Sequence, residues 1–496
     1  MSAYLRLCTA ASCRSRGAMA LLQHDDLPLK QVGCLGPCSE GPLLARGGQL
    51  LSLQHVATRT LEHSLAAALE NSHEIGADDP FLQLQRRLVL ARCGVVDPDC
   101  IDDALAHGAY QQLQAVLAAN DPSSVIDTIR RSGLRGRGGA GYPTGLKWAT
   151  VAAMPGEHKV VVCNADEGDP GAFMDRTLME GDPHTLLEGM AIAAFAVGAQ
   201  QGYIYVRAEY PLAIERLRTA IAAAAARDWL GTAISGSRFS FEIELRVGAG
   251  AYVCGEETAL IHSIEGRRGM PRPRPPYPAE HGVFGLPTLI NNVETFGNVP
   301  AVLELGVEAY GAGTKVFSLT GHVQRSGVLE VPMGTPLRTI VETMGGGAPP
   351  GRQIKAVQTG GPSGGCVPAS ALDTPVDYDS LKALGTIMGS GGMVVLDDTT
   401  NMVDIAAFFI AFSREESCGK CIPCRSGTVQ LELLLRKLLE HRGSAADLSQ
   451  LESLCHTVAA ASLCGLGQSA PKPVLSTLRH FRGDYLALLE PAEMER

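Results

Sequence analysis

The sequence has no long apolar run, no export signal and no excess of positive charge. No apolar stretch approaches the roughly 18 residues that a membrane span needs, and the first ten residues lack the apolar core of a signal peptide. The 42 basic residues are outnumbered by 52 acidic ones, which gives a net charge of −10 and argues against nucleic acid as the main partner. We therefore expect a cytoplasmic protein without direct membrane insertion.

The chain nevertheless holds fourteen cysteines. Because no export signal is present, these cysteines are not interpreted as disulfides. They form two groups: Cys8, Cys13, Cys34 and Cys38 near the start, and Cys418, Cys421, Cys424 and Cys464 near the end. The six scattered cysteines, of a kind typical of small buried residues, are Cys93, Cys100, Cys163, Cys254, Cys366 and Cys455.

With 496 residues the chain is too long for one hydrophobic core. Alternating strand and helix patterns from about residue 158 predict an α/β layer with a largely parallel sheet, and the apolar stretch 190–199 is expected to be a buried helix. A helix is also expected over 55–69. The predicted segments are 1–72 with the first cysteine group, 73–121 as a loosely packed helical linker, 122–305 as the α/β layer, 306–398 as short strands with glycine turns, and 399–496 as helices around the second cysteine group.

A glycine-rich stretch, RGRGGAGYPTGLKW, occupies residues 135–148 and matches the pattern G-x-G-x-x-G. A Rossmann turn needs a strand before its glycines, but a helix over 122–132 is predicted there. One alternative is a flexible loop, and the other is a cradle whose backbone N–H groups bind a phosphate. The charges of Arg135, Arg137 and Lys147 and the rings of Tyr142 and Trp148 favour a phosphorylated aromatic cofactor.

Three more polar stretches follow predicted strands, at the edge where α/β proteins bind ligands. They are CNADEGDPGAF at 163–173, GAGAYVCGEETAL at 248–260 and INNVETF at 290–296. For Glu256 and Glu257 the alternative is favourable placement of acidic side chains in the first turn of a helix. Three such loops together favour a ligand site.

The later cysteines have the spacing C-x2-C-x2-C, followed by Cys464. Three thiolates at this spacing fit a cubane iron–sulfur cluster better than the paired motifs of zinc sites. Cys464 is the candidate fourth ligand, and Cys455 is its rival within an apolar helical run. The first group has C-x4-C, a gap of 20 residues and C-x3-C, which suits a 2Fe–2S cluster, with a zinc site or an empty site as alternatives.

Together, the glycine stretch, the three strand-end loops and ESCGKCIPCR resemble the NADH-binding flavoprotein subunit of respiratory complex I and its soluble relatives, over about residues 122–485. The resemblance implies a multidomain α/β fold: a Rossmann-like FMN domain, a β-grasp-like (soluble ligand-binding-like) domain and a helical bundle with a 4Fe–4S cluster. Residues 1–72 look like a thioredoxin-like 2Fe–2S ferredoxin fused in front.

The resemblance also implies which residues bind the cofactors. The residues expected to hold FMN are Gly136, Arg137, Gly138, Gly139, Ala140, Gly141, Gly145, Lys147, Asn164, Asp166, Glu167, Tyr252, Gly255, Glu256, Asn291 and Asn292. Those expected near NAD are Tyr142 and Tyr277 at the adenine, with Asp169, Glu257 and Arg274. The 4Fe–4S ligands are expected to be Cys418, Cys421, Cys424 and Cys464, and the 2Fe–2S ligands Cys8, Cys13, Cys34 and Cys38.

The implied activity is that of an NAD(H):FMN oxidoreductase, or diaphorase, subunit, in which no side chain needs to act as a catalytic acid or base. Residues 79–110 resemble the linker of the beta subunit of NAD-dependent molybdenum or tungsten formate dehydrogenases. This resemblance implies a formate dehydrogenase-like catalytic alpha subunit and a small 2Fe–2S gamma subunit as partners. The alternatives are an NAD-reducing hydrogenase, complex I, or an iron–sulfur scaffold without flavin.

Overall fold

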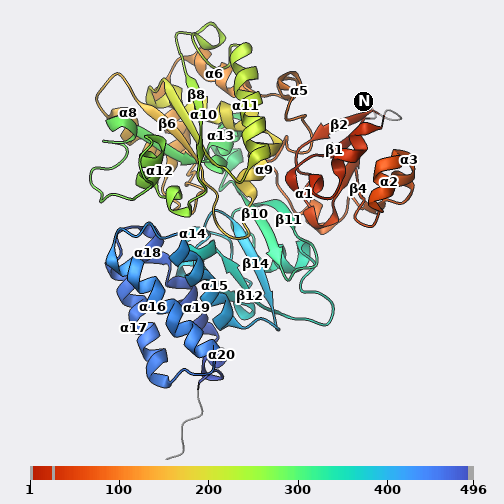
Figure 1. Ribbon diagram of the computed structural model, residues 1–496. Helices are drawn as coiled ribbons and strands as arrows, with labels where there is room; N and C mark the ends of the chain where they lie inside the picture. The colour runs from red at the N-terminus through yellow and green to blue at the C-terminus, as the bar shows by residue number, and fades with distance from the viewer. Residues whose placement is uncertain (1–3, 25–27, 490–496) are drawn as a thin grey trace, which may run out of the picture.

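The computed structural model describes residues 4–24 and 28–489, and it builds them around three β-sheets and a helical bundle (Figure 1). Helices and sheets alternate through the chain, so the mixed α/β class predicted from the sequence is confirmed. Within the described residues no helix is both long and apolar enough to cross a bilayer.

The central sheet has four parallel strands in the order β8-β7-β6-β9. They are β6 (Val160–Ala165), β7 (Gln201–Arg207), β8 (Glu242–Gly248) and β9 (Thr288–Asn292). The predicted parallel layer is therefore present. All four strands end at one edge of the sheet, and this edge carries the polar loops recognised in the sequence.

The two faces of this sheet bury different partners. Val161, Cys163 and Ile204 pack into a large core with α10 (Pro183–Val197), α11 (Pro211–Ala226) and α13 (Val293–Tyr310). Every residue of α10 is buried, as its apolar run predicted. Val162 and Tyr205, on the opposite face, pack with α12 (Glu257–Ile264) and with residues of the C-terminal cysteine region. The two faces of β6 thus contact the α/β core and the C-terminal cysteine region.

The N-terminal sheet has the strand order β2-β1-β3-β4-β5 and lies at the right of Figure 1. Its strands are β1 (Leu5–Cys8), β2 (Leu29–Val32), β3 (Leu43–Arg46), β4 (Gln49–Ser52) and β5 (His73–Ile75). Because β5 pairs with β4, the predicted boundary at residue 72 is too early. The helix expected over 55–69 is two helices, α2 (Thr58–His63) and α3 (Leu65–Glu70), since Ser64 has extended backbone angles and caps α3.

The segment 73–121 is not a loosely packed helical linker. It has three short helices, α4 (Pro80–Gln83), α5 (Ile101–Ala106) and α6 (Gln111–Ala119), separated by irregular chain. Buried carboxylates from elsewhere hold its backbone: Glu330 accepts the N–H groups of residues 88–90, and Glu188 accepts those of residues 112 and 113. The composition of this segment suggested loose packing because composition does not reveal contacts with residues that are distant in sequence.

The third sheet is mixed, with the order β11-β10-β14-β12-β13. Its strands are β10 (Thr314–Gly321), β11 (Gly327–Pro332), β12 (Ile354–Thr359), β13 (Gly365–Pro368) and β14 (Gly392–Asp397). The bundle follows with α15 (Met402–Glu415), α16 (Ile422–Leu439), α17 (Ala445–Ala461), α18 (Gly465–Ser469), α19 (Lys472–His480) and α20 (Arg482–Leu486).

Candidate functional site

The predicted polar loops meet at the carboxyl edge of the central sheet. Asn164 on β6 lies beside Asn292 on β9 in the register of the two strands. The Nδ2 group of Asn164 donates to the carbonyl of Gly255, 2.8 Å away in the 3-10 turn η4 (Tyr252–Gly255). Loops that are about 90 residues apart in sequence are thus brought to one place by the parallel strand order.

Several predicted cofactor ligands also cap helices. Glu256 accepts the N–H groups of residues 258 and 259 at the start of α12, and Asn292 does the same for residues 294 and 295 at the start of α13. Glu167 accepts the N–H groups of Asp175 and Arg176 at the start of α9 (Met174–Gly181). These side chains therefore stabilise helix starts, whether or not they also touch a cofactor.

Trp148 does not offer a stacking face, contrary to the expectation from the glycine stretch. It is fully buried in α8 (Thr144–Ala153), and its Nε1 group donates to Asn291 Oδ1 at 2.9 Å. The indole thus orients the amide of Asn291. Lys147, one residue earlier, reaches Glu257 Oε1 at 2.6 Å and the carbonyl of Ile290 at 3.0 Å.

The glycine loop connects two helices, α7 (Pro122–Arg131) and α8, so its context is not that of a Rossmann turn. Gly139 and Gly141 have φ values of +116° and +62°, which side chains rarely adopt, and Ala140 lies between them. Gly145 lies farther on, where α8 crosses α7 so closely that a Cβ atom would be 2.4 Å from the Cα of Arg130. The loop therefore requires glycine for its backbone angles and for this close crossing.

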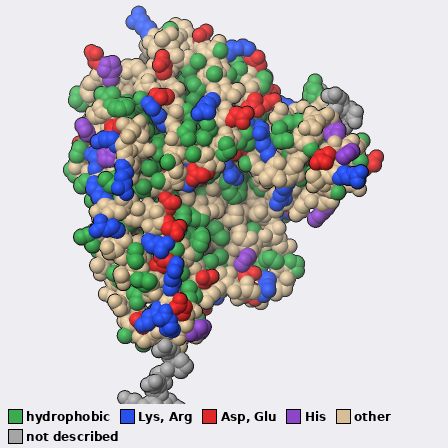
Figure 2. All heavy atoms as spheres, in the orientation of Figure 1, with side chains coloured by type: hydrophobic (Ala, Val, Ile, Leu, Met, Phe, Trp, Pro, Cys, Tyr) green, Lys and Arg blue, Asp and Glu red, His purple; other side chains and the backbone are tan. Residues whose placement is uncertain are grey.

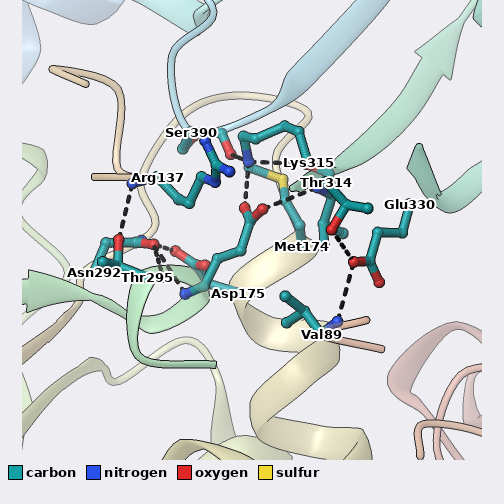
Figure 3. A network of polar contacts seen from close by, with 12 residues as sticks. Val89, Arg137, Met174, Asp175, Asn292, Thr295, Thr314, Lys315, Glu330 and Ser390 are labelled. Atoms are coloured by element: carbon teal, nitrogen blue, oxygen red, sulfur yellow. Dashed lines mark hydrogen bonds and ion pairs between the residues drawn. The ribbon is translucent and has the colours of Figure 1, made fainter. Parts of the chain in front are cut away.

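The sequence analysis did not identify the residues that support this glycine loop by hydrogen bonds and packing. Tyr378, in α14 (Tyr378–Ala383), donates to the carbonyl of Gly136 at 2.8 Å, and its ring lies against Gly141. The N–H of Arg137 donates to Thr295 Oγ1 at 2.8 Å (Figure 3). Tyr378 is more than 230 residues away in sequence, so no local signal could have indicated it.

A buried polar network continues beneath the loop (Figure 3). The Nδ2 group of Asn292 donates to Asp175, and Lys315 forms a fully buried ion pair with Glu294. Lys315 also donates to the carbonyl of Ser390, in the loop before β14. Asp175 follows the recognised stretch 163–173 by two residues and could have been added to the candidate site from sequence. The network joins the central sheet to the third sheet.

Asp169 also lies between the central sheet's domain and the third sheet. It accepts hydrogen bonds from Tyr252 Oη at 3.0 Å and from Ser390 Oγ at 2.9 Å. Burial raises the pKa of this carboxyl group above its usual value. Asp169 therefore positions Tyr252 and η4 directly.

The arrangement fits a bound flavin nucleotide. Both carboxylate oxygens of Asp166 are buried and have no hydrogen-bond partner within the described residues, and the closest cation, Arg207, is 3.7 Å away. Burial raises the pKa of Asp166 to about 7. A buried carboxyl group without a hydrogen-bond partner is costly, and the hydroxyl groups of a ligand chain would supply such partners. The glycine loop supplies the N–H groups that suit a phosphate.

The residues expected near NAD lie at the surface of this region, with the exception of Asp169, whose carboxyl group is buried. The side chains of Tyr142 and Tyr277 are both exposed. Glu257 is held between Lys147 and Arg274, whose Nη1 atom is 3.5 Å from Glu257 Oε2. Positive charge therefore surrounds the carboxylate that was expected to face the dinucleotide.

The C-terminal cysteines enclose a small cavity. Cys418, Cys421, Cys424 and Cys464 all line it, together with Val253 of η4 and with Pro271. Cys421 and Cys464 are the N-cap residues of α16 and α18, and burial raises the pKa of Cys424 to about 11. Four thiols around one cavity are the donor set of a cubane cluster, so the residues fit that group.

Cys455, the rival ligand, lies elsewhere. It is fully buried in α17, in the apolar core of the bundle with Leu431 and Leu451. Within residues 4–24 and 28–489, no three His, Cys, Asp or Glu side chains converge on the position of a single metal ion.

The N-terminal cysteines also gather, inside their own small domain. Cys8, Cys13 and Cys34 are buried, and Cys34 Sγ is 3.6 Å from Cys38 Sγ. Hydrogen bonds from Cys38 and Cys8 hold the pKa of Cys34 well below its usual value. Gly36, between Cys34 and Cys38, accepts the N–H of Val328, so this loop lies against β11. The four thiols are the donor set of a 2Fe–2S cluster.

Comparison with known families identifies three parts of the chain. The family described as the Nuo51 FMN-binding domain matches residues 129–301. The NADH-ubiquinone oxidoreductase-F iron–sulfur binding region matches residues 404–488, and the SLBB domain matches residues 316–367. These ranges contain the glycine loop and the C-terminal cysteine cavity.

Individual relatives are similar over most of the chain. NADP-reducing hydrogenase subunit HndC of Solidesulfovibrio fructosivorans is 51% identical over 81% of this chain and 83% of its own length. The F 2 subunit of NADH-quinone oxidoreductase from Rhizobium meliloti is 43% identical over 81% of this chain and 97% of its own. A crystal structure of NAD+-reducing NiFe-hydrogenase matches 99% of this chain and 84% of that chain, with 30% identity and a TM-score of 0.71.

These relatives share the glycine loop's domain and the cysteine-bearing bundle with this chain over more than two thirds of its length. The chain belongs to the family of the NADH-binding flavoprotein subunit, with FMN-binding and 4Fe–4S-binding domains, which includes the F subunits of NADH-quinone oxidoreductase and the hydrogenase protein HndC.

Proposed function

We propose that this chain is the diaphorase subunit of a soluble multisubunit oxidoreductase and passes electrons between NAD(H) and a C-terminal 4Fe–4S cluster. One observation carries the proposal. The turn η4 contributes Tyr252 and Gly255 to the strand-end site and Val253 to the wall of the cysteine cavity. The two predicted cofactor sites therefore meet at this four-residue turn.

Bound FMN would supply the conversion between two-electron and one-electron transfer. The glycine loop would hold the phosphate through its N–H groups, and Asn164, Asp166 and Asn292 would orient the rest of the flavin. Asp169 fixes Tyr252 at the boundary with the cluster site. The protein contributes binding and orientation, and no side chain is required as an acid or base.

The test uses the purified chain loaded with flavin. We expect NADH-dependent reduction of an artificial electron acceptor, and we expect denaturation to release FMN and not FAD. A flavin-loaded sample that does not reduce the acceptor with NADH would reject the proposed activity. A chain that holds iron but no flavin would instead support the scaffold alternative.

For the electron donor we propose a formate dehydrogenase-like alpha subunit with a small 2Fe–2S gamma subunit, which the linker resemblance over residues 79–110 supports. A hydrogenase is the second candidate, and the 51% identity to HndC favours it. Purification of the intact complex separates the two: molybdenum or tungsten with formate oxidation supports the first, and nickel with hydrogen oxidation supports the second.

We further propose that Cys8, Cys13, Cys34 and Cys38 hold a 2Fe–2S cluster. The burial of three thiols and the contact of Cys34 with Cys38 support this assignment. A domain of about 70 residues also gains stability from a bound metal centre. The zinc alternative is disfavoured, because no three His, Cys, Asp or Glu side chains in the described residues converge on one metal ion, and EPR after dithionite reduction tests it.

A further inference from the structure

Two arginines point their charges at the backbone of the C-terminal cysteine loop. Arg268 Nη2 donates to the carbonyl of Cys418 at 3.1 Å, and Arg425 Nη1 donates to the carbonyl of Gly419 at 2.9 Å. Neither forms an ion pair with a carboxylate among the described residues. Their positive charges are therefore held next to a ligand loop without a compensating negative charge.

A third cation belongs to the same group. Lys420 lines the cysteine cavity, and its Nζ atom donates to the carbonyl of Pro271 at 2.7 Å. Within the described part of the chain it also has no carboxylate partner. By contrast Arg267, next to Arg268 in the same loop, pairs with Glu265. Figure 2 shows Lys and Arg side chains gathered along the left margin, at the level of α12 and α18.

The placement of these charges has a consequence for a redox centre. A cubane cluster with four thiolate ligands gains one negative charge when it accepts one electron, and its potential depends on nearby charge and on solvent exposure. Cations close by stabilise the reduced form by Coulomb attraction, which water weakens at exposed positions without abolishing it. Opposing charge is also present, because Glu416, two residues before Cys418, accepts the N–H of Tyr252 at 2.7 Å.

We propose that Arg268, Lys420 and Arg425 raise the reduction potential of the cluster held by Cys418, Cys421, Cys424 and Cys464, and so favour electron transfer onto it. This inference rests on the proposed function. The three residues are positioning residues: they touch the backbone of the two loops that enclose the cluster site, and they act through their charge.

The experiment is a potentiometric titration of the whole chain with its cofactors, followed by EPR of the reduced cluster. The double variant Arg268→Gln/Arg425→Gln removes two charges and retains a polar N–H donor on each side chain. At a fixed potential near the midpoint we expect the ratio of reduced to oxidised cluster to fall about threefold for each charge removed. Arg268→Lys/Arg425→Lys should restore the ratio, and Arg436→Gln, in the last turn of α16 and far from the cysteine loop, should leave it unchanged.

The outcomes separate this inference from the proposed function. A double glutamine variant with full iron content and an unchanged potential overturns the inference, and so does an equal shift in the double lysine variant. If the double variant loses iron, Lys420→Gln replaces it, and an unchanged potential there has the same meaning. Wild-type protein without a 4Fe–4S signal rejects the proposed function and this inference together.

Discussion

The two cysteine groups have similar donor sets but different settings. The C-terminal thiols lie at helix starts around a cavity whose other wall comes from the central sheet's domain, through Val253. The N-terminal thiols lie inside a small sheet domain, whose loop around Gly36 and Ser39 reaches the third sheet. The first site is an interface between domains, and the second is the core of one domain.

Because of this difference, we expect the two groups of cysteine ligands to have different roles, one in electron transfer and one in domain stability. At the interface, a cluster can exchange electrons with the strand-end site because η4 borders both. Inside the small domain, the thiols lie in a leucine-rich core, and a bound metal centre would add to the stability of this domain. We therefore expect loss of the C-terminal cluster to interrupt electron transfer, and loss of the N-terminal cluster to affect mainly its own domain.

The largest expected effect tests the interface site. Cys464→Ser should lower the iron content from about six to about two per chain, the loss of one 4Fe centre, because one of the four thiols around the cavity is removed. Iron analysis and EPR of an anaerobic preparation measure this. Cys455→Ala is the matched control and should keep all six irons. Loss of iron in the control with retention in Cys464→Ser would exchange the two assignments.

The next effect tests the core site. Cys34→Ser should lower the iron content from about six to about four, because Cys34 contacts Cys38 in the buried group. NADH–dye activity should be spared, since the strand-end site is untouched. Cys100→Ser, at an exposed cysteine, is the control. Wild-type protein with four irons and no 2Fe–2S signal would contradict the prediction.

A third effect tests how the N-terminal domain is attached. Arg216 on α11 is buried and donates to the carbonyl of Glu180 and to Thr9 Oγ1, one residue after Cys8. Arg216→Ala should reduce the free energy of unfolding by about 2–4 kcal/mol, because buried hydrogen-bonding groups lose their partner. Faster proteolysis near residues 76–80, with unchanged C-terminal iron, should accompany the loss.

Arg218→Ala is the matched control, since Arg218 is exposed on the same helix two residues later. It should change stability by less than about 0.5 kcal/mol. Equal destabilisation by the two variants would show that helix α11, and not the contact with Thr9, accounts for the effect.

The sequence could predict elements that local patterns determine, but it could not predict contacts between distant parts of the chain. Period and composition were sufficient for the parallel sheet and the buried helix α10, because local patterns determine those elements. The strand-end loops were found because all parallel strands end at one edge. The support of Gly141 by Tyr378 was not predictable, since it depends on how the third sheet packs under the glycine loop.

Individual side chains were harder to assign than elements. Trp148 has an aromatic ring that could stack on a ligand, yet packing buries this ring, and its N–H donates to Asn291. Glu256 and Asn292 carry amide or carboxylate groups suited to a ligand, and the structure uses them as helix caps. Residue type indicates what a side chain can bind, whereas its partners depend on contacts distant in sequence.

The smallest expected effect concerns the choice of dinucleotide. We expect higher kcat/KM for NADH than for NADPH, because Glu257 and Asp169 carry negative charge near the expected ribose and a 2′-phosphate adds about two more negative charges. The preference should be modest, since Lys147 and Arg274 flank Glu257, and the similar HndC is named an NADP-reducing hydrogenase subunit. Glu257→Gln should narrow the ratio about threefold, whereas Glu265→Gln, at a carboxylate paired with Arg267, should not change it. Steady-state kinetics with both dinucleotides test the preference, and a wild-type kcat/KM ratio near one would reject it.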